Sequence, residues 1–141
     1  MPDIKHQFTI KAPVAKVYES ISQISGLKSW WTTDTEGEEK QGGVIRFGFG
    51  PGSFNKMKIN SLKKDQVVRW HCVDGPSEWI GTRLGFELSE DKDKQTVVKF
   101  DHSGWKEAGE FYASCNYHWG LFMRSLKALC ETGQGTPHVV G

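Results

Sequence analysis

Two histidines and two cysteines have the chemistry to form a metal site or a reactive group. Cys115 and His118 are three residues apart in a stretch of helical periodicity, so they share one helix face. His102 and Cys72 fall on the inward phase of two predicted strands. Imidazole and thiolate bind zinc, and a histidine beside a cysteine or beside the Thr82 hydroxyl is a typical base and nucleophile pair. These side chains define two hypotheses, a metal site and a catalytic site.

No motif supports either hypothesis. The pair of Cys115 and His118 lacks a recognised zinc spacing and a carboxylate placed by local sequence, so we expect no metal. The sequence contains no GxSxG, no glycine-rich phosphate loop and no carboxylate pair at a defined spacing, and a lone helical histidine is more often structural. We therefore assign no catalytic residue and expect no cofactor, with His118 and His102 as weak candidates for proton transfer.

The elements that position these side chains follow from hydrophobic periodicity. Alternation over residues 4–12 predicts a strand. Pro13 then stands at a tolerated first helical position, and apolar residues follow with helical spacing up to Ile21. Ser25 and Gly26 break this helix, and residues 27–31 are long enough for one more helical turn.

From Gly43 onward the period of the pattern is two. Five strands are predicted, separated by turn signals, at residues 43–50, 54–64, 66–73, 77–90 and 95–103. Short connections between them favour an antiparallel sheet. The acidic segment 34–40 is interpreted as a solvated loop. A helical stripe from Phe111 to Leu129 follows the last strand, and glycines at 133 and 135 end it.

This order predicts an α+β fold in one domain, residues 1–141. A curled antiparallel sheet of six or seven strands surrounds one long C-terminal helix, with two short helices after the first strand. The core covers about residues 4–131, and we expect a loose tail over 132–141.

A sheet curled around one helix leaves room for a cavity between them, and the aromatic content of 12%, with six tryptophans, suits its walls. The alternative is a solid core in which the aromatic rings only fill space. Of the adjacent tryptophans, we predict that Trp30 seals the packing of the short helices and that Trp31 faces the cavity. The predicted ligand-binding residues are Trp31, Phe47, Phe49, Met57, Trp70, Cys72, Ile80, Thr82, Leu84, Phe100, His102, Cys115, His118, Trp119 and Phe122.

Charge and composition exclude several classes of partner. Eighteen Lys and Arg oppose 17 Asp and Glu without a basic run, which argues against nucleic-acid binding. No stretch has the length of a membrane span or the pattern of a signal peptide. Three widely spaced cysteines suit reduced thiols. We therefore expect a cytoplasmic protein.

Several motifs together resemble a known family. They are Ala12-Pro13 with Val17-Tyr18, the GLKSWWT stretch at 26–32, the start of the sheet at 42–47, Val68-Arg69-Trp70, the HSGW turn at 102–105, and the last helix with Trp119 and Leu126. This set resembles the START-like or SRPBCC superfamily with its helix-grip fold, and within it the homologues of the activator of heat-shock-chaperone ATPase. The resemblance covers roughly residues 4–131.

The resemblance implies a fold but leaves several functions open. The first hypothesis is non-enzymatic binding of a small hydrophobic or aromatic molecule, of lipid or polyketide type, by a monomer or homodimer. The second is a cyclase-like or hydrolase-like enzyme that uses the same cavity. The third is an interaction module that acts on a chaperone ATPase and belongs to a stress response.

Overall fold

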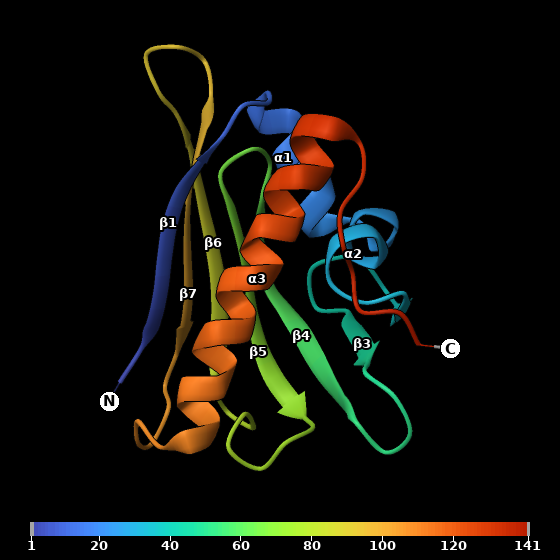
Figure 1. Ribbon diagram of the computed structural model, residues 1–141. Coiled ribbons are helices and arrows are strands. Elements are labelled where there is room, and N and C mark those ends of the chain that lie inside the picture. Colours follow the sequence, from blue (N-terminus) through green and yellow to red (C-terminus); the bar gives the residue numbers. More distant parts are fainter. Residues whose placement is uncertain (1, 141) are drawn as a thin grey trace.

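A seven-stranded antiparallel sheet and one long helix form the body of the computed structural model, which describes residues 2–140 (Figure 1). The strand order is β1-β7-β6-β5-β4-β3-β2. The strands are β1 (Ile4–Ile10), β2 (Asp34–Gly37), β3 (Val44–Gly48), β4 (Phe54–Lys63), β5 (Val67–Asp74), β6 (Arg83–Glu90) and β7 (Thr96–Ser103). The helices are α1 (Val14–Ser22), α2 (Ile24–Trp30) and α3 (Glu110–Thr132). The predicted helix-grip α+β fold is confirmed.

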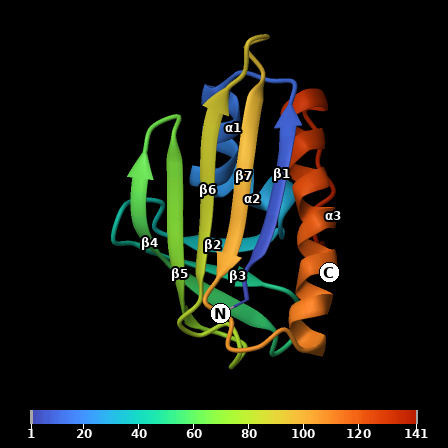
Figure 2. The ribbon, with the colours of Figure 1, turned by 90° about the vertical axis from the view of Figure 1, so that its left-hand side faces the viewer.

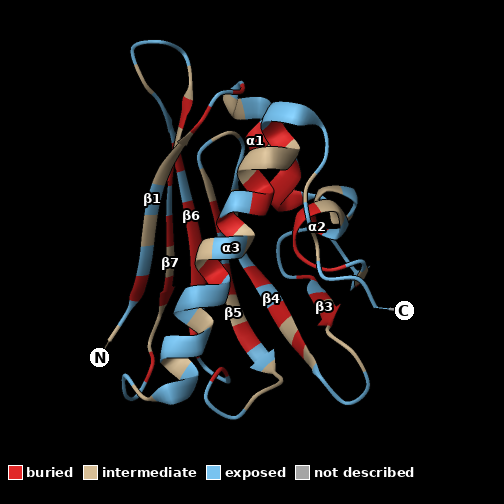
Figure 3. Cartoon of the chain, viewed as in Figure 1, coloured by how far each residue is buried: buried red, intermediate tan, exposed pale blue. Residues whose placement is uncertain are grey.

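The two faces of the sheet differ as the alternation predicted. Helix α3 runs along one face, next to β1 (Figures 1 and 2). Buried and exposed residues alternate along the strands (Figure 3). The exposed set includes basic residues such as Arg69 and Lys99. Arg69 donates there to Glu87 at 2.7 Å. Among the described residues, no helix is both long enough and apolar enough to cross a membrane.

The acidic segment that we interpreted as a loop contains a strand, so that interpretation is wrong for residues 34–37. Strand β2 pairs with β3, with Thr35 opposite Phe47. The Asp34 carboxylate accepts a hydrogen bond from Arg46 at 3.1 Å. Three polar residues and a glycine show no alternation of apolar and polar side chains, so the sequence does not reveal this strand. Pairing with β3 and the Arg46–Asp34 bond hold it in place.

The segment before β6 is a turn and not the predicted beginning of a strand. The amides of Trp79 and Ile80 both donate to the Pro76 carbonyl, at 2.9 and 3.2 Å, which makes one helical turn. Gly81 ends it with φ +87°, and β6 begins only at Arg83. The turn reverses the expected phase: Ile80 is 52% exposed and Trp79 is buried. The prediction that Ile80 faces a cavity is therefore wrong.

The tail after α3 is bound to the fold and is not loose as predicted. The Thr136 amide donates to Ser125 Oγ at 2.7 Å. The His138 amide donates to the Trp31 carbonyl at 2.8 Å, and the Thr33 amide donates to the His138 carbonyl at 2.9 Å. These bonds hold the tail across the end of α2 (Figure 1).

Gly26 in α2 packs directly on the backbone of α1, and Gly26→Ala is expected to lower the free energy of unfolding by about 1–3 kcal/mol. A Cβ there would lie 2.5 Å from the Cα of Ser20, a backbone atom that cannot move aside. Gly120→Ala in α3 is the matched control, because its Cβ would meet only the His6 ring at 3.6 Å and alanine favours a helix by up to about 1 kcal/mol. Urea unfolding measures the stability of both variants. Equal losses of stability in Gly26→Ala and Gly120→Ala would contradict the prediction.

Candidate ligand-binding groove

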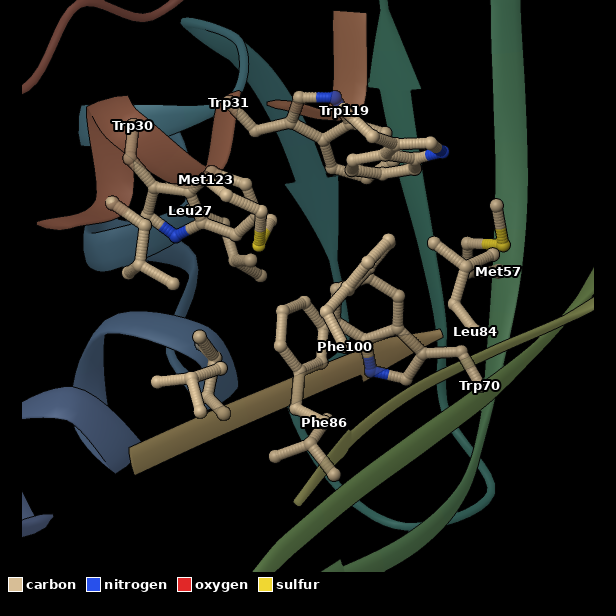
Figure 4. Packing of buried hydrophobic residues seen from close by; sticks show 14 of the residues in the cluster. Leu27, Trp30, Trp31, Met57, Trp70, Leu84, Phe86, Phe100, Trp119 and Met123 are labelled. Atoms are coloured by element: carbon tan, nitrogen blue, oxygen red, sulfur yellow. The ribbon is translucent and has the colours of Figure 1, made fainter. Parts of the chain in front are cut away.

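Aromatic side chains fill the interior at the depth where we expected a cavity (Figure 4). Trp31 lies between Trp70 and Trp119, with ring centroids 6.2 and 5.0 Å away. Phe47 packs on the same ring at 4.3 Å. The other tryptophan of the pair, Trp30, donates its indole N–H to the Ser20 carbonyl at 2.8 Å, which joins α2 to α1. The deep interior is therefore a packed core.

Eight of the predicted ligand-binding residues belong to this core. All are at most 1% exposed and none lines the groove described below; they are Phe47, Met57, Trp70, Cys72, Thr82, Leu84, Phe100 and His102. Strand alternation correctly separates inward from outward residues, but it carries no information on whether an inward residue meets a neighbour or a space.

A groove of about 360 Å³ opens beside the core, between α3, the start of β4, the turn at Pro76 and the tail. Six predicted residues line it: Trp31, Phe49, Cys115, His118, Trp119 and Phe122. The remaining lining residues are Ser53, Phe54, Asn55, Pro76, Trp79, Phe111, Ser114 and His138. The volume and the apolar lining fit a site for one small organic molecule.

Three of the unforeseen lining residues matter for the chemistry of the groove. Asn55 is in phase with the inward residues Met57 and Ile59, so the alternation contained a signal for it. Trp79 could not be found from alternation, because the turn at Pro76 places it inward. His138 enters from the tail, and its ring lies 5.4 Å from that of Phe49.

Two enclosed polar atoms of the described residues that line the groove lack hydrogen-bond partners. They are Asn55 Oδ1 and the indole Nε1 of Trp79. The Trp79 N–H lies near enough to the Cys115 sulfur to favour the thiolate, yet outside hydrogen-bond geometry. Burial, helped by Glu78, outweighs that effect and raises the pKa of the Cys115 thiol. Cys115 is therefore a protonated thiol at neutral pH and a weak nucleophile.

His102 forms a closed network of buried hydrogen bonds behind the groove. The Trp119 indole N–H donates to His102 Nδ1 at 3.1 Å. Because an indole N–H can only donate, Nδ1 is unprotonated, and Nε2–H donates to Thr82 Oγ1 at 2.8 Å. The Thr82 hydroxyl in turn donates to the Trp79 carbonyl. Burial lowers the pKa of His102 to about 3, so this histidine is neutral, and both its nitrogens are occupied.

His118 is the candidate histidine that lines the groove, and it is exposed. Its Nδ1–H donates to the Ser114 carbonyl at 2.8 Å, which leaves Nε2 as the acceptor nitrogen. The structure does not bring it to Thr82, whose hydroxyl is bonded elsewhere. Within residues 2–140, no three His, Cys, Asp or Glu side chains are arranged to hold a metal ion.

Comparison with known proteins agrees with this architecture. Residues 11–131 match the model of the family described as activator of Hsp90 ATPase homolog 1-like proteins. The chain belongs to this family. The similar structures include one described as the Aha1 dimer from Colwellia psychrerythraea, with 36% identity, 96% of this chain and 100% of that chain covered, and a TM-score of 0.87.

More distant structures share the fold of this activator-homologue family. CalU16 from Micromonospora echinospora has 16% identity and a TM-score of 0.77, with 95% of this chain and 76% of that chain covered. MLL2253 from Mesorhizobium loti has 14% identity and a TM-score of 0.78, with 91% and 96% covered. No curated protein matches the chain.

Proposed function

We propose that this protein binds a small apolar or aromatic molecule in the groove between α3, β4 and the tail, without catalysing a reaction. The observation that carries the proposal is the groove itself, of about 360 Å³, walled by Trp31, Trp79, Trp119 and Phe122. Apolar walls of this size gain free energy when a ligand replaces water. The helix-grip fold, which places a helix along the inner face of a curled sheet, supports the same function.

A fluorescence titration with N-phenyl-1-naphthylamine, an uncharged apolar probe, tests the proposal. Because three of the six tryptophans line the groove, we expect saturable quenching of tryptophan emission as the probe enters. Phe122→Arg puts a charge into the apolar wall and is expected to weaken probe binding about tenfold or more. Leu121→Arg, at an exposed neighbour outside this groove, is the matched control. No saturation, or equal binding by both variants, would contradict the proposal.

A second candidate is an interaction module that acts on a chaperone ATPase, in a protein that forms a homodimer. The family supports it, and the 36% identical relative is described as a dimer. Helix α3 also exposes the apolar side chains of Tyr117 and Leu121 outside the groove. Under this function the exposed face of α3 matters and the groove does not, so Leu121→Arg and not Phe122→Arg would be the damaging substitution.

A further inference from the structure

We infer that the end of the tail, residues 137–140, is a hinged strap that closes one end of the groove and moves away to admit an elongated apolar ligand. The inference rests on the proposed function and adds a moving part to the site. With the strap in place, the groove takes only a ligand of its own length.

A second hollow, of about 470 Å³, continues the groove along α3. The groove follows α3 from Phe111 to Phe122, and the second hollow follows it from His118 to Ala128. The two spaces therefore meet at His118 and Phe122, which line both. His138 of the strap also lines both. The strap thus stands at the junction of two spaces that lie one after the other along the same helix.

The tail is fixed immediately before the strap. A Cβ on Gly135 would lie 2.5 Å from the Ser29 carbonyl oxygen and 3.0 Å from that of Ser125, so Gly135 fits closely between α2 and α3. The Thr136 amide donates to Ser125 Oγ at 2.7 Å, and Ser125 is 1% exposed. These contacts hold the base of the strap while the residues after it move.

The strap itself is held mainly by hydrogen bonds near the surface. The His138 amide donates to the Trp31 carbonyl, and the Thr33 amide donates to the His138 carbonyl. The Val140 amide donates to the Thr33 hydroxyl at 3.2 Å. Val139 is 70% exposed and Val140 is 37% exposed, so burial of these side chains adds little. Because water can replace such bonds when the strap leaves, this segment has the character of one that opens locally.

The length of the ligand determines whether the strap must move. A ligand that fits the groove reaches the strap only with its end. A longer ligand needs the space that the His138 ring occupies between the groove and the second hollow. Its apparent affinity is then reduced by the fraction of molecules in which the strap is open. Restraining the strap should therefore affect long ligands alone.

A disulfide between positions 33 and 139 tests the inference. These positions follow the parallel bridge of Thr32 and His138 by one residue each. Their backbones therefore lie at the spacing of neighbouring strands, about 4.7–4.9 Å, which a disulfide can span. The double variant Thr33→Cys/Val139→Cys is titrated in its oxidised and its reduced form, with Val139→Cys alone as the control. The short probe is N-phenyl-1-naphthylamine, and the long probe is diphenylhexatriene, an uncharged apolar rod.

We expect oxidation to weaken diphenylhexatriene binding by the double variant about tenfold or more, because the restrained strap cannot open. The affinity for N-phenyl-1-naphthylamine should stay within about twofold, since the short probe leaves the strap in place. Reduction should restore diphenylhexatriene binding, and Val139→Cys alone should not respond to the oxidant.

His138→Ala tests the same inference without a disulfide. It removes the ring at the junction of the two spaces and should tighten diphenylhexatriene binding about fivefold, while N-phenyl-1-naphthylamine binding stays unchanged. Val139→Ala is the matched control, because it shortens the next side chain of the strap, which lines neither the groove nor the second hollow.

The outcomes separate this inference from the proposed function. The inference is overturned if the wild type does not bind diphenylhexatriene, or if oxidation of the double variant leaves this binding unchanged or weakens both probes alike. It is also overturned if His138→Ala has no larger effect than Val139→Ala. If N-phenyl-1-naphthylamine still saturates the wild type in those cases, the proposed function stands. If neither probe binds the wild type, both fail.

Discussion

Replacing Trp31 by alanine is expected to lower the free energy of unfolding by about 3–5 kcal/mol, as is typical of removing a large buried side chain. The Trp31 ring is 1% exposed and packs between Trp70 and Trp119. Phe47 from β3 closes the contact at 4.3 Å. Its removal leaves a space among rigid rings that belong to the sheet, α2 and α3, which cannot collapse without moving backbone.

Urea unfolding at neutral pH measures this loss. Tyr117→Ala is the control, because that side chain is also aromatic and large but is 67% exposed, and a surface substitution of this kind changes stability by within about 0.5 kcal/mol. If Trp31→Ala lowers the free energy of unfolding no more than Tyr117→Ala does, the packing of Trp31 between Trp70 and Trp119 is wrong.

The stability of the protein is expected to fall as the pH drops below about 6.5, and His102 to account for much of that fall. Its ordinary pKa of 6.5 is lowered to about 3 in the fold by burial. Between these values the unfolded chain binds a proton at this residue and the folded protein does not. The stability present above pH 6.5 is therefore lost at up to about 1.4 kcal/mol per pH unit as the pH falls toward 3.

Urea unfolding of His102→Asn between pH 7 and pH 4 isolates this contribution. The variant should be less stable at pH 7, because the bonds from Trp119 and to Thr82 are disturbed. The free energy of unfolding of the variant should nevertheless depend less steeply on pH, because unfolding no longer exposes this imidazole to protonation. His118→Asn, which removes an exposed histidine of the groove region, is the control for the loss of an imidazole. If the free energy of unfolding of His102→Asn falls with pH as steeply as that of the wild type, the claim that His102 is buried in its neutral form is wrong.

The sequence was sufficient for the fold because both hydrophobic periods are long and regular. The period of two along β4, β5 and β7 and the helical stripe of α3 determine which faces meet, whatever the details of packing. Strand β2 is the exception, because its three polar residues and one glycine show no periodicity and it forms only by pairing with β3.

The groove was predictable only in part, for two physical reasons. Alternation shows that Trp70 and His102 point inward, but only the packing of Trp31 and Trp119 shows that the space beside them is filled. Trp79 enters the groove because Pro76 begins a turn within a stretch that otherwise has the composition of a strand. A local turn and the three-dimensional filling of space both lie outside what periodicity encodes.

The indole N–H signal of Trp79 in a proton–nitrogen correlation NMR spectrum tests most directly the central claim, that the groove is the binding site. Trp79 lines the groove, whereas the Trp30 ring lies outside it and donates its indole N–H to the Ser20 carbonyl. On titration with N-phenyl-1-naphthylamine, we predict that the Trp79 indole signal shifts and saturates as the aromatic probe enters the groove beside this ring, while the Trp30 signal stays in place. A Trp79 signal that does not move at saturating ligand would contradict the assignment of the groove as the binding site.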